Sequence, residues 1–302
     1  MAPKITPSSP NDQQPSDQRT ADLPLAIVIP WFGRGHNGGA EMHAWQLAAR
    51  LAARGRAVEV ITTCCRSFQD DWGVNHLAEG ISSEPEGFTV RRFPVEPRDT
   101  VSFDRVNGAL LGLGRENLRP GLPPIGPEDE RVFADDLIKS PALIEYLANA
   151  ADHYHGFLFL PYLYGTTLRG VPAVAVKAFL QPCLHDEAYA YLPLVFSAFY
   201  RAKAVLCLSD GEAELAFRLM GPGIRSKTVV TGAGVDAPVP GEDASLLAPI
   251  GDNPFVLCLG RQDAGKNTDL LVRAYADYRR RNPKSRLHLV LAGPGKIPMP
   301  DD

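Results

Sequence analysis

Short apolar segments rich in β-branched residues alternate with helical patterns along most of the chain. The segments that predict strands are residues 25–29, 57–62, 87–95, 156–160, 171–178, 204–209, 227–231, 255–259 and 287–291. The segments that predict helices are residues 41–54, 101–113, 128–151 with Pro141 as a candidate break, 189–202, 210–220 and 268–281. Strands that alternate with helices through short turns are typical of a parallel, doubly wound α/β sheet with helices on both faces.

The alternation stops after residue 236 and then starts again. Residues 237–253 have the composition of a linker, and residues 1–22, rich in Pro, Ser, Gln and Asp, have that of a disordered tail. We therefore expect an N-terminal Rossmann-like domain over 23–236 and a second domain that begins at 254. Residues 254–302 are fewer than the roughly 100 that an α/β domain needs. We expect the chain to be truncated early in that second domain; the alternative is that its last elements extend the edge of the first sheet.

Composition and charge exclude several classes of protein. The 302 residues are 45% hydrophobic and 22% charged, as in soluble globular proteins, and the formal net charge of −4 gives no basic surface for a nucleic acid. No apolar run approaches the roughly 20 residues that span a bilayer. The five cysteines form no Cys-x-x-Cys, which favours buried thiols in a reducing cytoplasm. A cytoplasmic protein is expected, and peripheral contact with the inner face of the membrane stays open.

Two adjacent glycines, Gly38 and Gly39, separate the first predicted strand from the first predicted helix. The backbone N–H groups at a helix start have no acceptor, and the helix dipole favours anions there. Glycine also lets a phosphate or a sugar hydroxyl approach closely. An ordinary strand-to-helix turn explains the pair equally well, since the standard Gly-x-Gly-x-x-Gly spacing of dinucleotide-binding loops is absent.

Charged groups follow two later strands of the pattern. Arg261 and Lys266 come directly after the strand at 255–259, and two cations on one loop suit a diphosphate. His185, followed by Asp186 and Glu187, comes after the strand at 171–178 and is a candidate to donate to a sugar hydroxyl or to move a proton. The two acids are candidates to orient this histidine or to cap the next helix. Solvated loop charges and a structural histidine are the alternatives.

With these residues in place, the chain resembles the large retaining glycosyltransferase family 4, which has the GT-B fold of two Rossmann-like domains. The likeness is strongest over 27–62, where Gly-Gly-Ala-Glu precedes the helix, and it returns over 183–187, 205–212, 230–236 and 255–267. Residues 66–150 match little of the family pattern.

The resemblance implies a role for each of these residues. Gly38 and Gly39 would lie in the cleft near the acceptor and the donor phosphates, with Glu41 at the helix start beside them. His185 matches a histidine that contacts the transferred sugar. Arg261 and Lys266 match the pair that clasps the donor diphosphate and stabilises it as the leaving group, without an obligatory metal.

The implied reaction moves a hexosyl group from a UDP- or GDP-linked sugar to a glycan or lipid-linked acceptor, with retention, in polysaccharide synthesis. Two departures weaken it: the family's Glu-x7-Glu segment would lie beyond Asp302, and Asn-Gly-Val-Asp is replaced by Ala233-Gly-Val-Asp236. A GT-B sugar-nucleotide epimerase and a non-catalytic glycan-binding or vestigial fragment are the alternatives. A dinucleotide oxidoreductase is disfavoured, because Glu59 lies within the second strand and not at its end.

Overall fold

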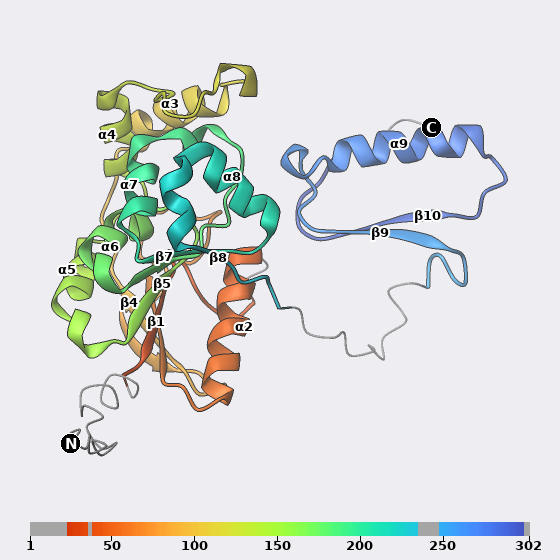
Figure 1. Cartoon of the computed structure of the whole chain (residues 1–302). Coiled ribbons are helices and arrows are strands. Elements are labelled where there is room, and N and C mark those ends of the chain that lie inside the picture. The colour runs from red at the N-terminus through yellow and green to blue at the C-terminus, as the bar shows by residue number, and fades with distance from the viewer. Residues whose placement is uncertain (1–22, 36–37, 235–247, 299–302) are drawn as a thin grey trace, which may run out of the picture. The chain divides into compact units, whose positions relative to one another are not determined.

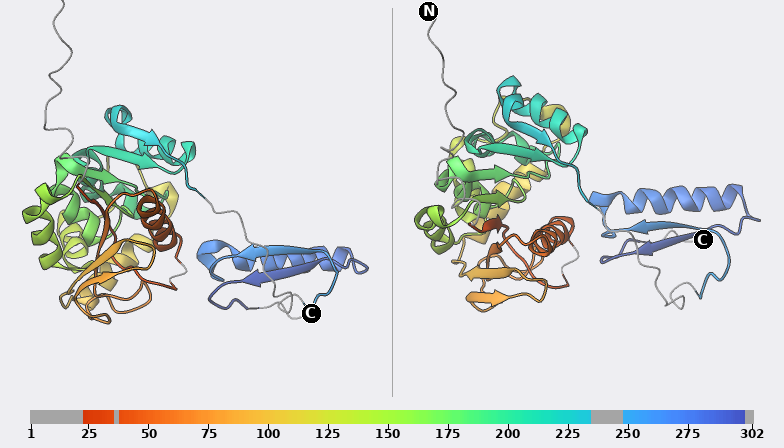
Figure 2. Two further views of the ribbon diagram at one scale, coloured as in Figure 1. Left: turned by 90° about the horizontal axis from the view of Figure 1, so that it is seen from below. Right: turned by 60° about the horizontal axis from the view of Figure 1, so that its bottom comes forward.

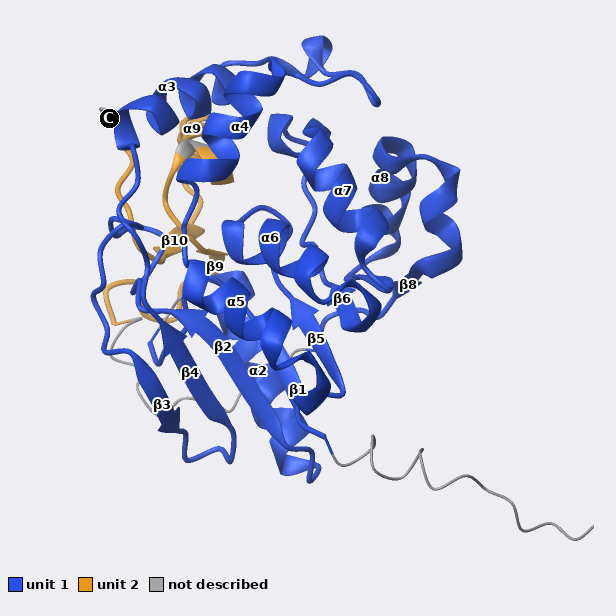
Figure 3. Cartoon of the chain, turned by 90° about the vertical axis from the view of Figure 1, so that its left-hand side faces the viewer, with its two compact units in different colours: residues 1–234 blue, residues 235–302 orange. Residues whose placement is uncertain are grey.

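The computed structural model describes residues 23–35, 38–234 and 248–298 (Figure 1). The expected tail, 1–22, and residues 237–247 of the expected linker lie outside the described residues. The chain divides into two compact units, residues 1–234 and residues 235–302 (Figure 3), and each is described by itself.

Unit 1 is built on one eight-stranded sheet. Its strands are β1 (Leu25–Val28), β2 (Val58–Thr63), β3 (Gly80–Ser83), β4 (Thr89–Phe93), β5 (Gly156–Phe159), β6 (Ala178–Leu180), β7 (Ala204–Cys207) and β8 (Thr228–Val230). Their order in the sheet is β3-β4-β2-β1-β5-β6-β7-β8, and every neighbouring pair is parallel except β3 and β4. The predicted doubly wound, mostly parallel α/β sheet is confirmed.

Helices cover both faces of this sheet. They are α2 (Gly39–Ala53), α3 (Thr100–Leu111), α4 (Pro127–Asp136), α5 (Pro141–Asn149), α6 (Gly165–Ala173), α7 (Pro193–Arg201) and α8 (Asp210–Met220). Successive side chains of a strand point to opposite faces. Ile27 of β1 accordingly packs with α2, whereas Ala26 and Val28 belong to a larger core cluster that includes side chains of α3 to α8. Figure 2 shows the helices on the two sides of the sheet.

The strand order places a ligand-binding position next to β1. This strand pairs with β2 on one side and with β5 on the other, and the chain builds outward from it in both directions. Open α/β sheets bind ligands at such a switch point, outside the carboxyl ends of the strands. The segment that leaves β1 there leads to Gly38 and Gly39.

One predicted strand of unit 1 is wrong, and strand β3 and helix α6 were not predicted. Residues 171–178 are not a strand: α6 ends at Ala173, and β6 begins only at Ala178. The β-branched residues Val171 and Val174 suggested a strand, but they lie three positions apart and both pack into the larger core cluster. Strand β3 was not predicted, because all four of its residues are exposed and it has no apolar run. The break in the helical segment 128–151 is confirmed, since α4 ends at Asp136 and α5 begins at Pro141.

Unit 2 contains two parallel strands, β9 (Phe255–Leu259) and β10 (His288–Ala292), and one helix, α9 (Thr268–Arg281). In its described part, only Thr268 and Val272 of α9 are buried, whereas Leu257 and Leu259 of β9 are more than half exposed. Among the helices of the described residues, none is long and apolar enough to cross a membrane.

Candidate functional site

The first turn of α2 is arranged around Gly38. This residue is the N-cap of α2, and no side chain caps the helix at that position. A Cβ atom at Gly38 would collide with the carboxylate of Glu41, which folds back over the helix start and accepts a hydrogen bond from the indole Nε1 of Trp31. Gly39, in contrast, is exposed, and a Cβ there would meet nothing. Gly38 therefore makes room for Glu41, whereas Gly39 leaves the helix start open to a ligand.

A hydrogen bond joins α2 to the carboxyl end of β6. The Nε2 atom of His43 lies 2.8 Å from Oε1 of Gln181, and since the amide oxygen accepts, the imidazole donates. Gln181 is the first residue after β6 and is buried; its backbone N–H donates to the carbonyl of Phe159 at the end of β5. Sequence analysis missed this pair, because the strand was predicted to end at Ala178. With the correct boundary, a polar residue directly after the strand would have indicated it.

The loop after β6 is fixed by the buried carboxylate of Glu212 in α8. Its Oε1 accepts from the N–H of Leu184 at 2.7 Å, and its Oε2 accepts from the N–H of Leu208, after β7, at 2.5 Å. The hydroxyl of Ser209 accepts from the N–H of Glu212, as in a Ser-x-x-Glu capping box. These bonds hold Cys183 in a left-handed conformation, φ 52°, that non-glycine residues rarely adopt.

The thiol of Cys183 stays protonated at neutral pH. Burial, followed by the negative charges of Glu212 and Glu41, raises its pKa to about 12. A thiol with so high a pKa is a poor nucleophile at neutral pH. The hydrogen bond between His43 and Gln181 places the first turns of α2 next to the segment that follows β6, at the carboxyl edge of the sheet.

The three polar residues 185–187 differ in their surroundings, because only His185 is exposed, whereas the two acids accept hydrogen bonds from other parts of unit 1. His185 is exposed, and its side chain has no hydrogen-bond partner within the described residues. Asp186 accepts from Arg218 and from the hydroxyl of Tyr191, both at 2.8 Å, and from Arg115. Burial opposes ionisation of Asp186, but these donors outweigh it and lower the pKa of its carboxyl.

Glu187 accepts a hydrogen bond of 2.7 Å from the hydroxyl of Tyr162, and its side chain does not cap the short helix that follows. Neither Asp186 nor Glu187 orients His185, so that expectation is wrong. The two acids anchor the loop and leave the imidazole of His185 free to meet a ligand.

Unit 2 presents Arg261 and Lys266 on one loop between β9 and α9. The Nε atom of Arg261 lies 2.9 Å from Asp263, and the guanidinium is about half exposed. Asp263 also accepts from the backbone N–H of Lys266, and the side chain of Lys266 is exposed. A Cβ atom at Gly293 would collide with the carbonyl of Gly260, so these glycines let the ends of β9 and β10 approach closely. The loop therefore holds two cations at the carboxyl edge of its own sheet.

The carboxylate of Glu59, in the second strand, is hydrogen-bonded within the core of unit 1. Glu59 is buried, accepts from Nε of Arg91 at 2.8 Å and is hydrogen-bonded by the hydroxyl of Tyr154. Its position within β2 is confirmed, and its oxygens are not available to a ribose. Within the described ranges, no group of three His, Cys, Asp or Glu side chains is arranged to hold a metal ion.

The structure thus assembles two candidate sets, one in each unit. In unit 1, Gly38, Gly39 and Glu41 lie at the start of α2, next to the loop after β6 that carries His185. In unit 2, Arg261 and Lys266 lie on one loop. Unit 1 therefore presents open backbone N–H groups, a carboxylate and an imidazole to a ligand, and unit 2 presents two cations.

Comparison with known proteins gives one curated relative. A GDP-mannose-dependent alpha-(1-6)-phosphatidylinositol monomannoside mannosyltransferase of Mycolicibacterium smegmatis (strain ATCC 700084 / mc(2)155) is 30% identical over 118 residues, which are 36% of this chain and 31% of that protein. The match spans about a third of the length of that relative. No family model matches the chain.

Solved structures establish the fold. A trehalose-6-phosphate synthase matches with a TM-score of 0.54 and 14% identity over 90% of this chain and 65% of its own. The Burkholderia multivorans alpha,alpha-trehalose 6-phosphate synthase matches with a TM-score of 0.52 and 14% identity over 90% and 64%. The chain spans slightly less than two thirds of these structures. Its fold is that of the Rossmann-like domains of GT-B glycosyltransferases.

Proposed function

We propose that the chain is part of a retaining glycosyltransferase of family 4, which moves a hexosyl group from a nucleotide-diphosphate sugar to a glycan or lipid-linked acceptor. The observation that carries this proposal is the match over 118 residues to a mannosyltransferase that is GDP-mannose-dependent. The GT-B type of fold agrees with this proposal, but the fold alone does not select the donor or the acceptor, because it is compatible with many of each.

In this proposal, unit 1 binds the acceptor. The open N–H groups at Gly39 and the carboxylate of Glu41 offer a donor and an acceptor for sugar hydroxyls. The exposed imidazole of His185 contacts the transferred sugar. The bond between His43 and Gln181 holds the two segments together, so these residues position the site and do not touch the reacting atoms.

Unit 2 binds the donor diphosphate in the same proposal. Asp263 holds the guanidinium of Arg261 through Nε, which leaves the other N–H groups of its planar fork for phosphate oxygens, and Lys266 adds a point charge. As the glycosidic bond to the donor breaks, negative charge develops on the departing diphosphate, and the two cations stabilise it. Since they neutralise this charge, no obligatory metal is proposed.

The relative favours one donor and one kind of acceptor. Its name includes GDP-mannose and a phosphatidylinositol monomannoside, so we place GDP-mannose first among the donors, before UDP-linked sugars, and a lipid-linked glycan first among the acceptors. A lipid-linked acceptor requires contact with a membrane surface, and we therefore propose a cytoplasmic protein that binds peripherally at the inner face of the membrane.

The test is a transfer assay on the protein isolated from its native source. GDP-mannose and UDP-glucose are each offered with and without lipid-linked and free glycan acceptors, and the product's anomeric configuration is determined by NMR. Nucleotide release that requires an acceptor, with retention, is the expected result. Release without an acceptor would indicate the epimerase, and glycan binding without any turnover would indicate a binding module; either outcome contradicts the proposal.

A further inference from the structure

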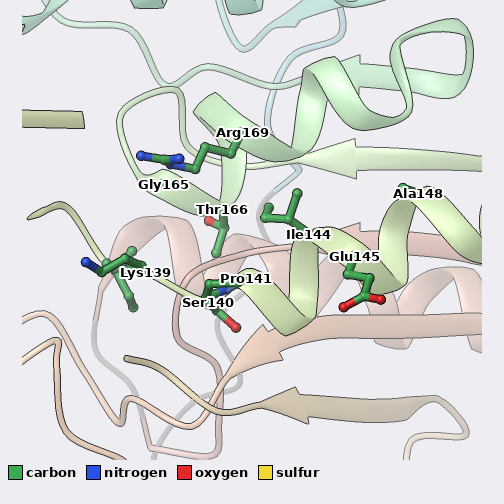
Figure 4. A pocket seen from close by; sticks show the side chains of 10 residues that line it. Lys139, Ser140, Pro141, Ile144, Glu145, Ala148, Gly165, Thr166 and Arg169 are labelled. Atoms are coloured by element: carbon green, nitrogen blue, oxygen red, sulfur yellow. The ribbon is translucent and has the colours of Figure 1, made fainter. Parts of the chain in front are cut away.

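A cavity of about 430 Å³ lies in unit 1 between the first turns of α5 and α6 (Figure 4). Its wall includes Ser140 and Pro141 at the start of α5, and Gly165 and Thr166 at the start of α6. Neither N-cap residue, Ser140 of α5 or Tyr164 of α6, caps its helix with its side chain. At the start of α6 the N–H groups of Gly165 and Thr166 have no acceptor within the helix, whereas α5 begins with Pro141, which has no N–H. Both helix dipoles are positive at this end. Two helix starts thus meet at one cavity, which favours a negatively charged ligand.

A buried hydroxyl without a partner points to the same kind of ligand. Thr166 is 2% exposed, and its Oγ1 has no hydrogen-bond partner among the residues that the structure describes. In Figure 4 this hydroxyl points toward the side of the cavity where Lys139 and Arg169 lie. The neighbouring hydroxyl of Ser140, in contrast, donates to the carbonyl of Pro94 at 2.7 Å. Buried polar atoms are almost always hydrogen-bonded, so a missing partner at a cavity wall indicates a place for a ligand oxygen.

Two cations complete the cavity wall. The Nζ atom of Lys139 has Asp136 at 3.9 Å, too far for a hydrogen bond, and its three donors remain available. Arg169 bonds Asp135 at 2.6 Å and the carbonyl of Ala134 through one terminal nitrogen, which leaves the other N–H groups of the guanidinium. The wall also contains one acid, Glu145. In Figure 4, Ile144 lies between this acid and Lys139.

We propose that this cavity is a phosphate-binding site, in which Lys139, Arg169, the hydroxyl of Thr166 and the backbone N–H groups of Gly165 and Thr166 at the start of α6 bind the phosphate oxygens. Ile138 and Ile144 form an apolar wall beside it, which suits the body of a phosphate monoester. The phosphate belongs to a small phosphorylated metabolite or to a lipid headgroup. The site is in unit 1 and uses neither Arg261 nor Lys266, so it does not rest on the proposed donor site.

The primary experiment titrates the full chain with inorganic phosphate at constant ionic strength, with backbone amides observed by NMR. We expect saturable shifts centred on Gly165 and Thr166. Lys139→Gln weakens phosphate binding about tenfold, because it removes a charge-assisted hydrogen bond. Thr166→Val, which keeps the shape of the side chain, weakens it about fivefold.

Two variants serve as controls, and a second set of titrations identifies the source of the phosphate. Arg131→Gln removes an exposed cation of α4 outside the cavity, and Arg261→Ala removes one from unit 2; neither changes phosphate binding at the cavity. If glycerol 3-phosphate binds more tightly than vesicles that contain phosphatidic acid, the natural ligand is a small phosphorylated metabolite. If the vesicles bind more tightly, the natural ligand is a lipid headgroup. An absence of saturable shifts at Gly165 and Thr166, or equal affinities in wild type, Lys139→Gln and Thr166→Val, would overturn the proposal.

Discussion

Two adjacent glycines at the start of α2 have different steric surroundings, and this difference gives a matched pair of variants. Gly38→Ala places a methyl group on the carboxylate of Glu41, which must move and release the indole of Trp31. The colliding atoms are the end of a flexible side chain, so we expect a loss of only about 1 kcal/mol in the free energy of unfolding. The indole N–H resonance of Trp31 should shift toward the position of an indole without a partner.

The control for Gly38 is its neighbour. Gly39→Ala meets open space within a helix, where alanine is favoured over glycine by up to about 1 kcal/mol. We expect this variant to be as stable as wild type or more so, with the resonance of Trp31 unchanged. Equal behaviour of the two variants in urea unfolding and in the Trp31 resonance would show that Glu41 does not depend on Gly38.

At the scale of the element, the start of α6 depends on one glycine. A Cβ atom at Gly165 would collide with the carbonyl oxygen of Ile138, which is backbone and cannot rotate away. We expect Gly165→Ala to lower the free energy of unfolding by about 2 kcal/mol, since overpacking forces the backbone to shift. Gly108→Ala, in α3, meets nothing and should stabilise the chain by up to about 1 kcal/mol. Urea unfolding of both variants measures the contrast, and similar free energies would contradict it.

The loop after β6 and helix α8 are joined by Asp186, and this contact is pH-dependent. Because its folded pKa is lowered, the contact contributes stability above the unfolded pKa, near 4, and that contribution is lost as the pH falls through the folded pKa. We expect Asp186→Asn to be less stable than wild type by about 1–2 kcal/mol at pH 7, with the difference shrinking below about pH 4.

The measurement for Asp186 is urea unfolding of both proteins from pH 7 to pH 3. Asp104→Asn removes an exposed carboxyl from α3 and should stay within about 0.5 kcal/mol of wild type across the range. A difference between wild type and Asp186→Asn that is the same at both ends of the range would mean that ionisation of this carboxyl does not support the loop.

At the scale of the whole molecule, local patterns predict the sheet better than they predict the site. Helix α8 was predicted with its observed bounds, since Ser209 caps it and glycine follows Met220. Strand β6 was misplaced, because the valines of the preceding segment have β propensity but pack as part of a helix and its end. Tertiary packing decided that segment, and no local rule could have done so.

The candidate site shows the same division. The positions of Gly38 and Gly39 at the start of a helix, and of Arg261 after a strand, follow from local order alone. The bond between His43 and Gln181 joins residues 138 positions apart, so only the strand order brings it about. Contacts between residues far apart in the sequence decide which loops form a site, and they cannot be predicted from the local patterns of a single sequence.

The central claim, that the chain is part of a nucleotide-sugar transferase, is tested most directly by equilibrium binding of GDP, UDP and NAD to the chain. We predict that GDP or UDP binds and NAD does not, and that Arg261→Ala weakens nucleotide binding about tenfold or more, through the loss of a charge-assisted contact. Arg273→Ala removes an exposed arginine of α9 paired with Asp269 and should leave the affinity unchanged. Binding of NAD, or equal nucleotide affinity in wild type and Arg261→Ala, would contradict the account.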